Sequence, residues 1–191
     1  MTELAATPNP TKSKTGSSLR RVEDAHLLVG KGRFTDNRPP SGQLHLYFIR
    51  SYLAHGRIVS IDKEEALQVE GVVAIYTAED LLADGVKPLP IADKYKRVDG
   101  KPMAQPAWHA LANGVVRYVG EAVVAVVAES QAQAVDAAQL VEIEYEELPA
   151  AGNLAVASSP GAPLVWEDAP HNIVAQKTFG DEAAVDAAFA N

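Results

Sequence analysis

The chain has 191 residues, no cysteine and a formal net charge of −8. Without cysteine, this chain forms no disulfide and no cysteine-ligated zinc or iron–sulfur cluster. The acidic charge is spread along the chain without a basic block, which argues against a nucleic-acid-binding patch. No apolar segment has the pattern of a secretory signal or the length of a membrane span. We expect a cytoplasmic protein with one globular domain and tails.

The first 41 residues divide into two parts by composition. Residues 1–19 are rich in Thr, Ser, Pro and Lys, which predicts a disordered N-terminal tail. Residues 20–41 mix charges with Gly30 and Gly32, and predict an ordered segment with a short helical turn followed by a loop. The turn signal Pro39-Pro40-Ser41-Gly42 ends this segment.

Short strands and capped turns are predicted next. Residues 43–50, 56–62 and 72–76 have strand patterns. Asp62, with Glu65 three residues later, predicts a short helix that ends near Gly71. Thr77 opens a further helical turn by the same capping logic. Residues 84–106 hold four prolines and two glycines and predict a long surface loop.

The stretch from Val115 to Pro149 organises the prediction. Residues 115–118 read as a strand, and the apolar run 122–128 suits a strand that is covered on both faces. Ser130 is a suitable N-cap for a helix with a narrow face of small apolar residues. The alternating residues 141–145 predict a half-buried strand. This β-α-β unit favours an α/β (α+β) fold with a mixed sheet and short helices.

After Pro149 the apolar periodicity weakens. Residues 150–171 hold three prolines and predict a linker, and residues 173–179 predict one more strand. Asp181 begins a helix on which Val185 and Phe189 share one face without a partner. We expect residues 172–191 to be the truncated start of a second domain.

The sequence shows no catalytic or metal-binding motif. His45, His55 and His109 are the better candidates for metal or acid–base chemistry, and His26 and His171 are weaker ones. No H-E-x-x-H, paired helical histidines or G-x-S-x-G occurs. Gly30-Lys31-Gly32 lacks the third glycine and the preceding strand of a phosphate loop. We expect these histidines to have structural roles.

Three groups of charged residues keep two interpretations open. Arg50, Ser51, His55 and Arg57 contact either an anion or partner, or the local backbone carbonyls of a turn, which we favour. Glu121 pairs with Arg117 or with a partner surface. The basic loop 93–97 is either solvated, which we favour, or a docking site.

Several segments, in order, resemble one protein family. RRVED at 20–24, GKGRFTD at 30–36, GQLH at 42–45, residues 50–58 and the block 118–149 are similar to the N-terminal part of a molybdenum-binding large subunit. The family is that of xanthine dehydrogenase, aldehyde oxidase and carbon monoxide dehydrogenase. Tyr52 stands where this family usually has proline. As a possible interface or structural signature we single out Arg20, Arg21, Glu23, Asp24, Arg50, His55, Arg57, Gly120 and Glu121.

The resemblance implies an α/β hammerhead domain at residues 42–149, ahead of a larger domain. That larger domain binds a molybdenum pyranopterin, as molybdopterin or its cytosine dinucleotide form, and supplies a glutamate base. Hydroxylation there uses oxygen from water, and electrons leave through 2Fe-2S clusters to FAD on small and medium partner subunits. The resemblance places no catalytic, cofactor-binding or metal residue within this chain.

Three functional hypotheses follow. The first is a scaffold portion of a hydroxylase that acts on a small molecule such as an aldehyde, a purine, an N-heterocycle or carbon monoxide. The second is a separately encoded hammerhead subunit that completes the enzyme in trans. The third is a free-standing small-molecule binding protein. The isolated chain is expected to be inactive under the first two.

Overall fold

The computed structural model describes residues 21–35, 39–91, 95–97, 99–177 and 179–190. The chain divides into two compact units, Met1–Gln43 and Leu44–Asn191. The predicted tail over residues 1–19 lies outside the described residues. In the first unit, helix α1 spans Asp24–Leu27 and is followed by a loop, as predicted. Among the described residues, no helix has the length and hydropathy needed to cross a bilayer.

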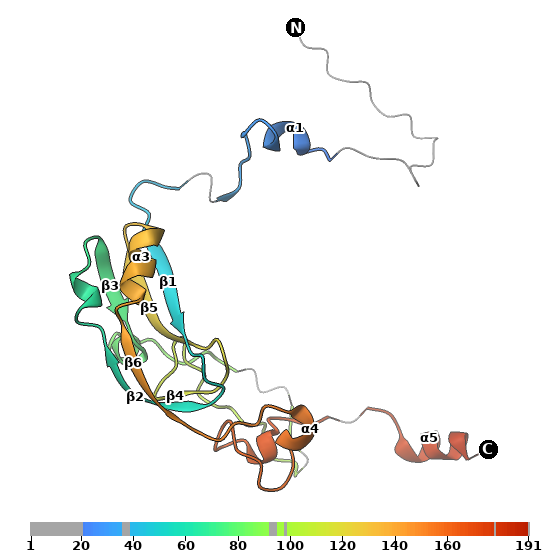
Figure 1. Cartoon of the computed structure of the whole chain (residues 1–191). Helices are drawn as coiled ribbons and strands as arrows, with labels where there is room; N and C mark the ends of the chain where they lie inside the picture. The colour runs from blue at the N-terminus through green and yellow to red at the C-terminus, as the bar shows by residue number, and fades with distance from the viewer. Residues whose placement is uncertain (1–20, 36–38, 92–94, 98, 178, 191) are drawn as a thin grey trace, which may run out of the picture. The chain divides into compact units, whose positions relative to one another are not determined.

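The second unit contains two three-stranded antiparallel sheets (Figure 1). Sheet A has the order β1-β5-β3, with strands β1 (His45–Arg50), β5 (Ala122–Ala128) and β3 (Val72–Tyr76). Sheet B has the order β4-β2-β6, with strands β4 (Val115–Val116), β2 (Gly56–Asp62) and β6 (Glu142–Glu147). The α/β (α+β) fold class is confirmed, while two antiparallel sheets replace the single mixed sheet.

Polar side chains cap the α-helices of this unit, which are α2 (Ala78–Ala83), α3 (Gln131–Ala138), α4 (Leu154–Ala157) and α5 (Glu182–Phe189). The unit also has two 3-10 helices among its described residues, η2 (Ala66–Gln68) and η3 (Pro170–Asn172). Thr77 and Asp80 form a capping box at α2, and Ser130 and Asp181 cap α3 and α5 through their side-chain oxygens. These three predicted helix starts are confirmed.

The predicted β-α-β unit is split between the two sheets. β5 pairs with β1 on one edge and with β3 on the other, so it has no free edge for the strand that follows α3. β6 therefore pairs with β2 in sheet B. The alternation of its residues places Ile143 and Tyr145 against the main core and leaves the glutamates outside.

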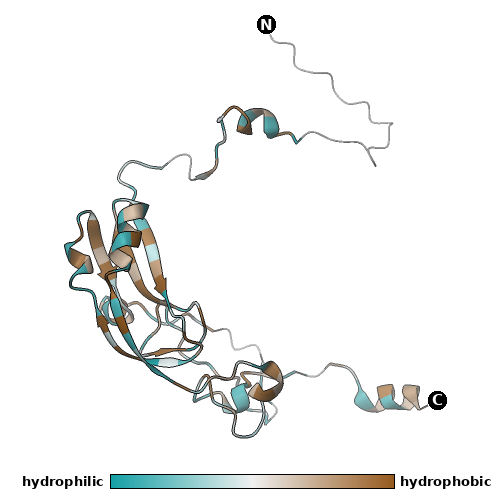
Figure 2. Ribbon diagram, in the orientation of Figure 1, coloured by the Kyte–Doolittle hydropathy of each residue, from teal (hydrophilic) through white to brown (hydrophobic). Residues whose placement is uncertain are grey.

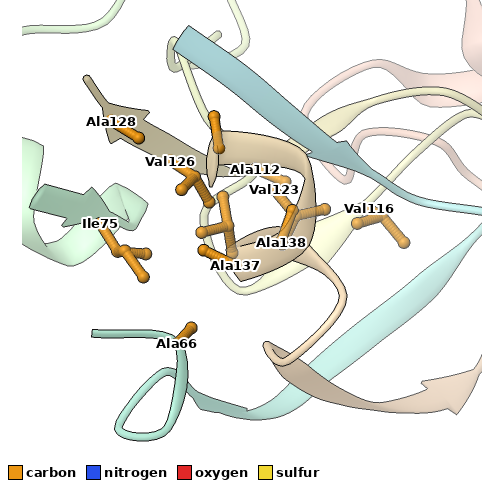
Figure 3. Close-up of a cluster of buried hydrophobic side chains, with 11 residues drawn as sticks. Ala66, Ile75, Ala112, Val116, Val123, Val126, Ala128, Ala137 and Ala138 are labelled. Atoms are coloured by element: carbon orange, nitrogen blue, oxygen red, sulfur yellow. The ribbon is translucent and has the colours of Figure 1, made fainter. Parts of the chain in front are cut away.

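The core lies around β5, which is buried on both faces as predicted. Val123, Val124 and Val126 are fully buried, and Figure 3 shows Val123 and Val126 close to the alanine face of α3. Ala125 packs in a second cluster with Leu111 and other apolar residues. Small side chains at Ala134 and Ala137 let α3 approach the sheet closely.

The turn before β3 differs from its prediction. The expected helix from Asp62 contracts to η2, because the Asp62 carboxylate accepts the N–H of Glu64 two residues on and no capping box forms with Glu65. Gly71 then turns the chain with a φ of +83°, and Gln133 fills the space that a side chain there would need. The Gly71 carbonyl accepts the N–H of Glu129 at 2.8 Å, and this bond connects the start of β3 to the end of β5.

The strand predicted over residues 173–179 is not present in the described part of that range. Val174 accepts from Ala104 N at 3.0 Å and Gln176 donates to Lys96 O at 3.2 Å. These partners lie in the long loop 84–106, which contains no regular strand to pair with among its described residues. The strand prediction is therefore wrong, because a strand pattern needs a neighbouring strand.

Candidate functional site

Two buried polar residues meet through their main chains at the end of sheet A. Ser51 and Glu121 are 3% and 8% exposed, and they are the buried polar or charged residues of the described chain. Ser51 N donates to Glu121 O at 2.8 Å, and Gly120 N donates to Ser51 O at 2.7 Å. Arg50 Nη1 donates to Gly120 O at 2.8 Å. The structure thus brings Arg50, Gly120 and Glu121 of the predicted signature together in one place, which we call the Glu121 junction.

The Glu121 carboxylate holds the tight turn that precedes β5. It accepts the backbone N–H of Arg117, four residues earlier. Burial raises the pKa of the Glu121 carboxyl, and bonds from the Arg117 and Tyr118 backbone together with the Arg117 charge oppose that rise. Gly120 has a φ of +91°, a conformation that glycine adopts without strain. The sequence left two partners open for Glu121. In the structure its carboxylate is bonded to Arg117, through the Arg117 main-chain N–H.

The Arg117 side chain contacts the segment that follows the hammerhead strands. Its guanidinium carbon lies 3.7 Å from the ring centroid of Trp166, a cation–π arrangement. Nε donates to Val165 O at 3.2 Å, and Nη1 donates to Val115 O at 2.9 Å. Burial lowers the pKa of Arg117, while the charges of nearby acids, Glu121 first, act in the opposite direction. Arg117 therefore joins β4 to residues 165–166.

The Asn172 side chain also holds this segment, through hydrogen bonds to its main chain. Its Oδ1 accepts the N–H of Val165 at 2.7 Å, and its Nδ2 donates to Ala157 O at 2.8 Å and Pro163 O at 2.9 Å. Asn172 has a φ of +57°, where asparagine is among the better tolerated residues. The predicted linker over 150–171 therefore contains ordered structure, including α4, held by directed bonds. Whether it separates two domains stays a prediction.

A second group of signature residues joins the start of β2 to the end of β6. His55 Nδ1 lies 2.7 Å from Pro149 O, and since a carbonyl only accepts, Nδ1 carries the proton. Arg57 Nε donates to Glu146 Oε2 at 3.1 Å, with both side chains more than half exposed. Between them, a Cβ added at Gly56 would lie 2.9 Å from Leu53 Cδ1, so a side chain there would require Leu53 to move. Partner contact by His55 and Arg57 stays a prediction.

The remaining signature residues lie in the first unit. Arg21, Glu23 and Asp24 form the start of α1, where Asp24 N donates to Arg21 O at 3.3 Å and Leu27 N donates to Glu23 O at 3.0 Å. Arg20 lies outside the described residues. The structure gives these residues local backbone roles, and their part in an interface stays a prediction.

The described residues contain no group of three or more histidine, aspartate or glutamate side chains arranged to hold a metal ion. The Glu121 junction is made of main-chain bonds, one buried carboxylate and one guanidinium on an aromatic ring. This arrangement fastens elements together and offers no nucleophile–base pair for catalysis.

Trp166 and Asn172 make contacts that were not expected from the sequence. Trp166 stands in the segment predicted as a linker, where a large aromatic residue beside two acids was a usable signal. Asn172 gave no signal, because its role depends on a positive φ and on partners up to 15 residues away.

Comparison with known proteins identifies the fold. Residues 29–149 match the model of the "Aldehyde oxidase and xanthine dehydrogenase, a/b hammerhead domain" family. The chain belongs to this family. The predicted hammerhead at residues 42–149 lies within the matched range, and the family resemblance is confirmed.

Two relatives of this hammerhead chain are named as a large subunit or a large chain. The nicotine 6-hydroxylase large subunit of Paenarthrobacter nicotinovorans is 38% identical over 188 residues, which cover 96% of this chain and 22% of the relative. The carbon monoxide dehydrogenase large chain of Hydrogenophaga pseudoflava is 36% identical over 182 residues, covering 88% and 21%. The solved carbon monoxide dehydrogenase from Oligotropha carboxidovorans has a TM-score of 0.72 at 32% identity, covering 92% and 22%. The chain spans about a fifth of the length of these relatives.

Proposed function

We propose that this chain is the N-terminal hammerhead portion of the large, molybdenum-binding subunit of a molybdenum hydroxylase. In this proposal residues 42–149 are the hammerhead domain, residues 150–171 are the connection, and residues 172–191 begin the cofactor-binding domain. The observation that carries it is the family match over residues 29–149. The Glu121 junction consists of main-chain bonds and one cation–π contact beside it, which supports a scaffold role.

The complete subunit would act on a small molecule with water-derived oxygen. Its substrate class would be aldehydes, purines or N-heterocycles, or carbon monoxide. Relatives named for nicotine 6-hydroxylation, carbon monoxide oxidation and xanthine dehydrogenation support this range without selecting one member. Molybdopterin, plain or as the cytosine dinucleotide, would be held outside the described residues. A cytoplasmic location stays a prediction.

Partner subunits would complete the electron path. We propose a small 2Fe-2S subunit and a medium FAD subunit, in line with relatives whose names mark them as large subunits or chains or as one subunit of a complex. The ordered segment around Asn172 supports a scaffold role, because it would hold residue 172 firmly where the larger domain is proposed to begin.

The test is expression of the 191-residue chain in a host that makes the molybdenum cofactor. Metal analysis, pterin fluorescence after release and hydroxylase assays on the four substrate classes are each expected to be negative. The nicotine 6-hydroxylase large subunit, expressed with its partners in the same host, is the positive control. Bound molybdopterin or turnover in the chain alone would contradict the scaffold role.

A second candidate is a separately encoded hammerhead subunit that binds a partner chain and completes the enzyme in trans. The exposed apolar face of α5, with Val185 51% and Phe189 89% exposed, fits docking of a partner chain; Figure 2 shows brown and teal bands along this helix. The nucleotide sequence after the Asn191 codon separates the two candidates. A continuous reading frame supports the first, and a stop codon with a neighbouring partner gene supports the second.

A further inference from the structure

The outer edge of β1 has no partner in the described chain. β1 pairs with β5 on its inner side, and no backbone hydrogen bond from a described residue reaches its other side. A strand edge of this kind presents unpaired N–H and C=O groups, which are a template for pairing with another strand. The free edge covers six residues, His45–Arg50, which is an ordinary strand length.

The other edge strands of the two sheets differ from β1 in charge, bonding or length. β6 carries Glu142, Glu144 and Glu146 along its length, a charge pattern that opposes strand addition. On β3, the Lys63 ammonium donates a hydrogen bond to the Ile75 carbonyl oxygen at 3.1 Å. β4 is two residues long. Along β1 the basic residues are His45 and Arg50, one at each end, and no acidic residue occurs.

A groove lined by both polar and apolar side chains runs beside this edge. It has a volume of about 570 Å³ and is lined by Leu46–Arg50 of β1 and by Val135, Ala138 and Gln139 of α3. Figure 1 shows α3 next to β1, and the two elements are in contact. Leu46 is 48% exposed. Five residues of extended chain span about 17 Å, so the groove follows β1 for the length of an added strand.

We propose that an extended segment from the remaining part of the large subunit pairs with β1 and adds a fourth strand to sheet A. This rests on the proposed function, since relatives are about five times as long as this chain and hold the additional segments. Main-chain bonds would give the affinity, and small apolar side chains facing Val135 and Ala138 would give the fit. The positive Arg50 at one end of the groove favours an acidic residue at the matching end of the added strand.

Hydrogen exchange of the β1 amides tests the proposal. The 191-residue chain is compared with the product purified from its host through a tag placed before Met1. We expect the outward amides of residues 45–50 to exchange about tenfold or more slowly in the host product. The edge of β6, residues 142–147, is the internal control and is expected to exchange at the same rate in both samples.

Val135→Arg places a charge in the groove, and Ala132→Arg is its matched control. Val135 is half-buried and outside the main core cluster, and Ala132 is exposed on the same helix away from the groove lining. Both variants are expected to keep the melting temperature of the isolated chain. In the host product V135R is expected to return β1 exchange to the rate of the isolated chain, and A132R is not.

Three results would overturn the proposal. One is equal β1 exchange in both samples. Another is slow β1 exchange in the isolated chain that becomes slower still as the protein concentration rises, because this assigns the edge to a second copy of the chain. The last is slow exchange that disappears when the small and medium subunits are removed, which assigns it to them. The mass of the host product tests the proposed function separately, because a 20.3-kDa product contradicts it whatever the exchange rates are.

Discussion

The strand β5 and the segment 150–174 are held in place by different forces. β5 is stabilised by buried apolar surface, because Val123, Val124 and Val126 are fully buried in the core around this strand. The later segment buries few large side chains and depends on Asn172 and on the Arg117–Trp166 contact. Stabilisation by a large buried apolar surface is spread over many residues. Stabilisation by a few hydrogen bonds is lost when a single residue is replaced. The two regions should therefore respond differently to single substitutions.

The largest effect is expected from Val126→Asp. A carboxylate in the fully buried environment of Val126 has no partner, so we expect the unfolding free energy to fall by about 4 kcal/mol or more. Far-UV circular dichroism during heating should then show no cooperative transition. The control is Val119→Asp, since Val119 is 65% exposed and should accept the charge. A native melting curve for V126D would mean that burial area does not decide the stability of this sheet.

Asn172→Ala tests the directed bonds. It removes three hydrogen bonds and leaves alanine at a φ of +57°, so we expect a local loss of about 2–4 kcal/mol. Limited proteolysis should cut residues 150–174 first, while the melting of the sheets changes little. Asn172→Gly keeps the backbone conformation and loses the bonds, so it separates the two contributions. Equal protease resistance of N172A and the unchanged chain would contradict this account.

The Glu121 junction predicts a pH effect that connects the two regions. Burial raises the pKa of Glu121 above its unfolded value, so the folded chain holds this proton more tightly. Its contribution to the unfolding free energy is therefore largest at low pH and decreases as the pH rises through the folded pKa.

Glu121→Gln removes this titration. Urea unfolding between pH 4 and 7 should show E121Q becoming more stable relative to the unchanged chain as the pH rises, by about 1.4 kcal/mol for every tenfold difference in proton affinity between the folded and unfolded states. Glu129→Gln, at an exposed position, is the control and should show no such trend. A trend of the opposite sign would mean that the hydrogen bonds outweigh the burial.

The smallest effect is expected from Arg57→Ala. Arg57 and Glu146 form a directed bond at 3.1 Å, but their side chains are 58% and 60% exposed and screened by solvent. We expect a change of about 0.5 kcal/mol or less, measured by urea unfolding. If R57A lowered the unfolding free energy as much as N172A, an exposed hydrogen bond would stabilise this fold as strongly as the half-buried ones.

The sequence predicted local structure well where a pattern and its cause lie in the same segment. The valine run of β5, the alanine face of α3 and the caps at Thr77, Ser130 and Asp181 were each confirmed. The sheet partner of β6 was not predictable in this way, because it depends on β5 having both edges occupied by distant strands.

The sequence singled out residues of the Glu121 junction, but it did not predict their arrangement. Arg50, Gly120 and Glu121 were selected from sequence and lie together, although 70 residues separate Arg50 from Gly120. Burial of the Glu121 side chain was not predicted, since it results from how sheet A ends against residues 50–51. The order in residues 150–171 was missed because proline content suggested a linker, while the contacts that hold the segment come from Arg117 and Asn172.

Gly71 has a consequence for how this sequence can change over generations. Its backbone angle is strained for other residues, and the Gln133 amide occupies the space of a side chain, while its carbonyl is bonded to Glu129. A substitution would have to meet both conditions, so shortening Gln133 alone would not release the position. Codon 71 should therefore remain fixed in descendants of this gene while the neighbouring exposed positions drift.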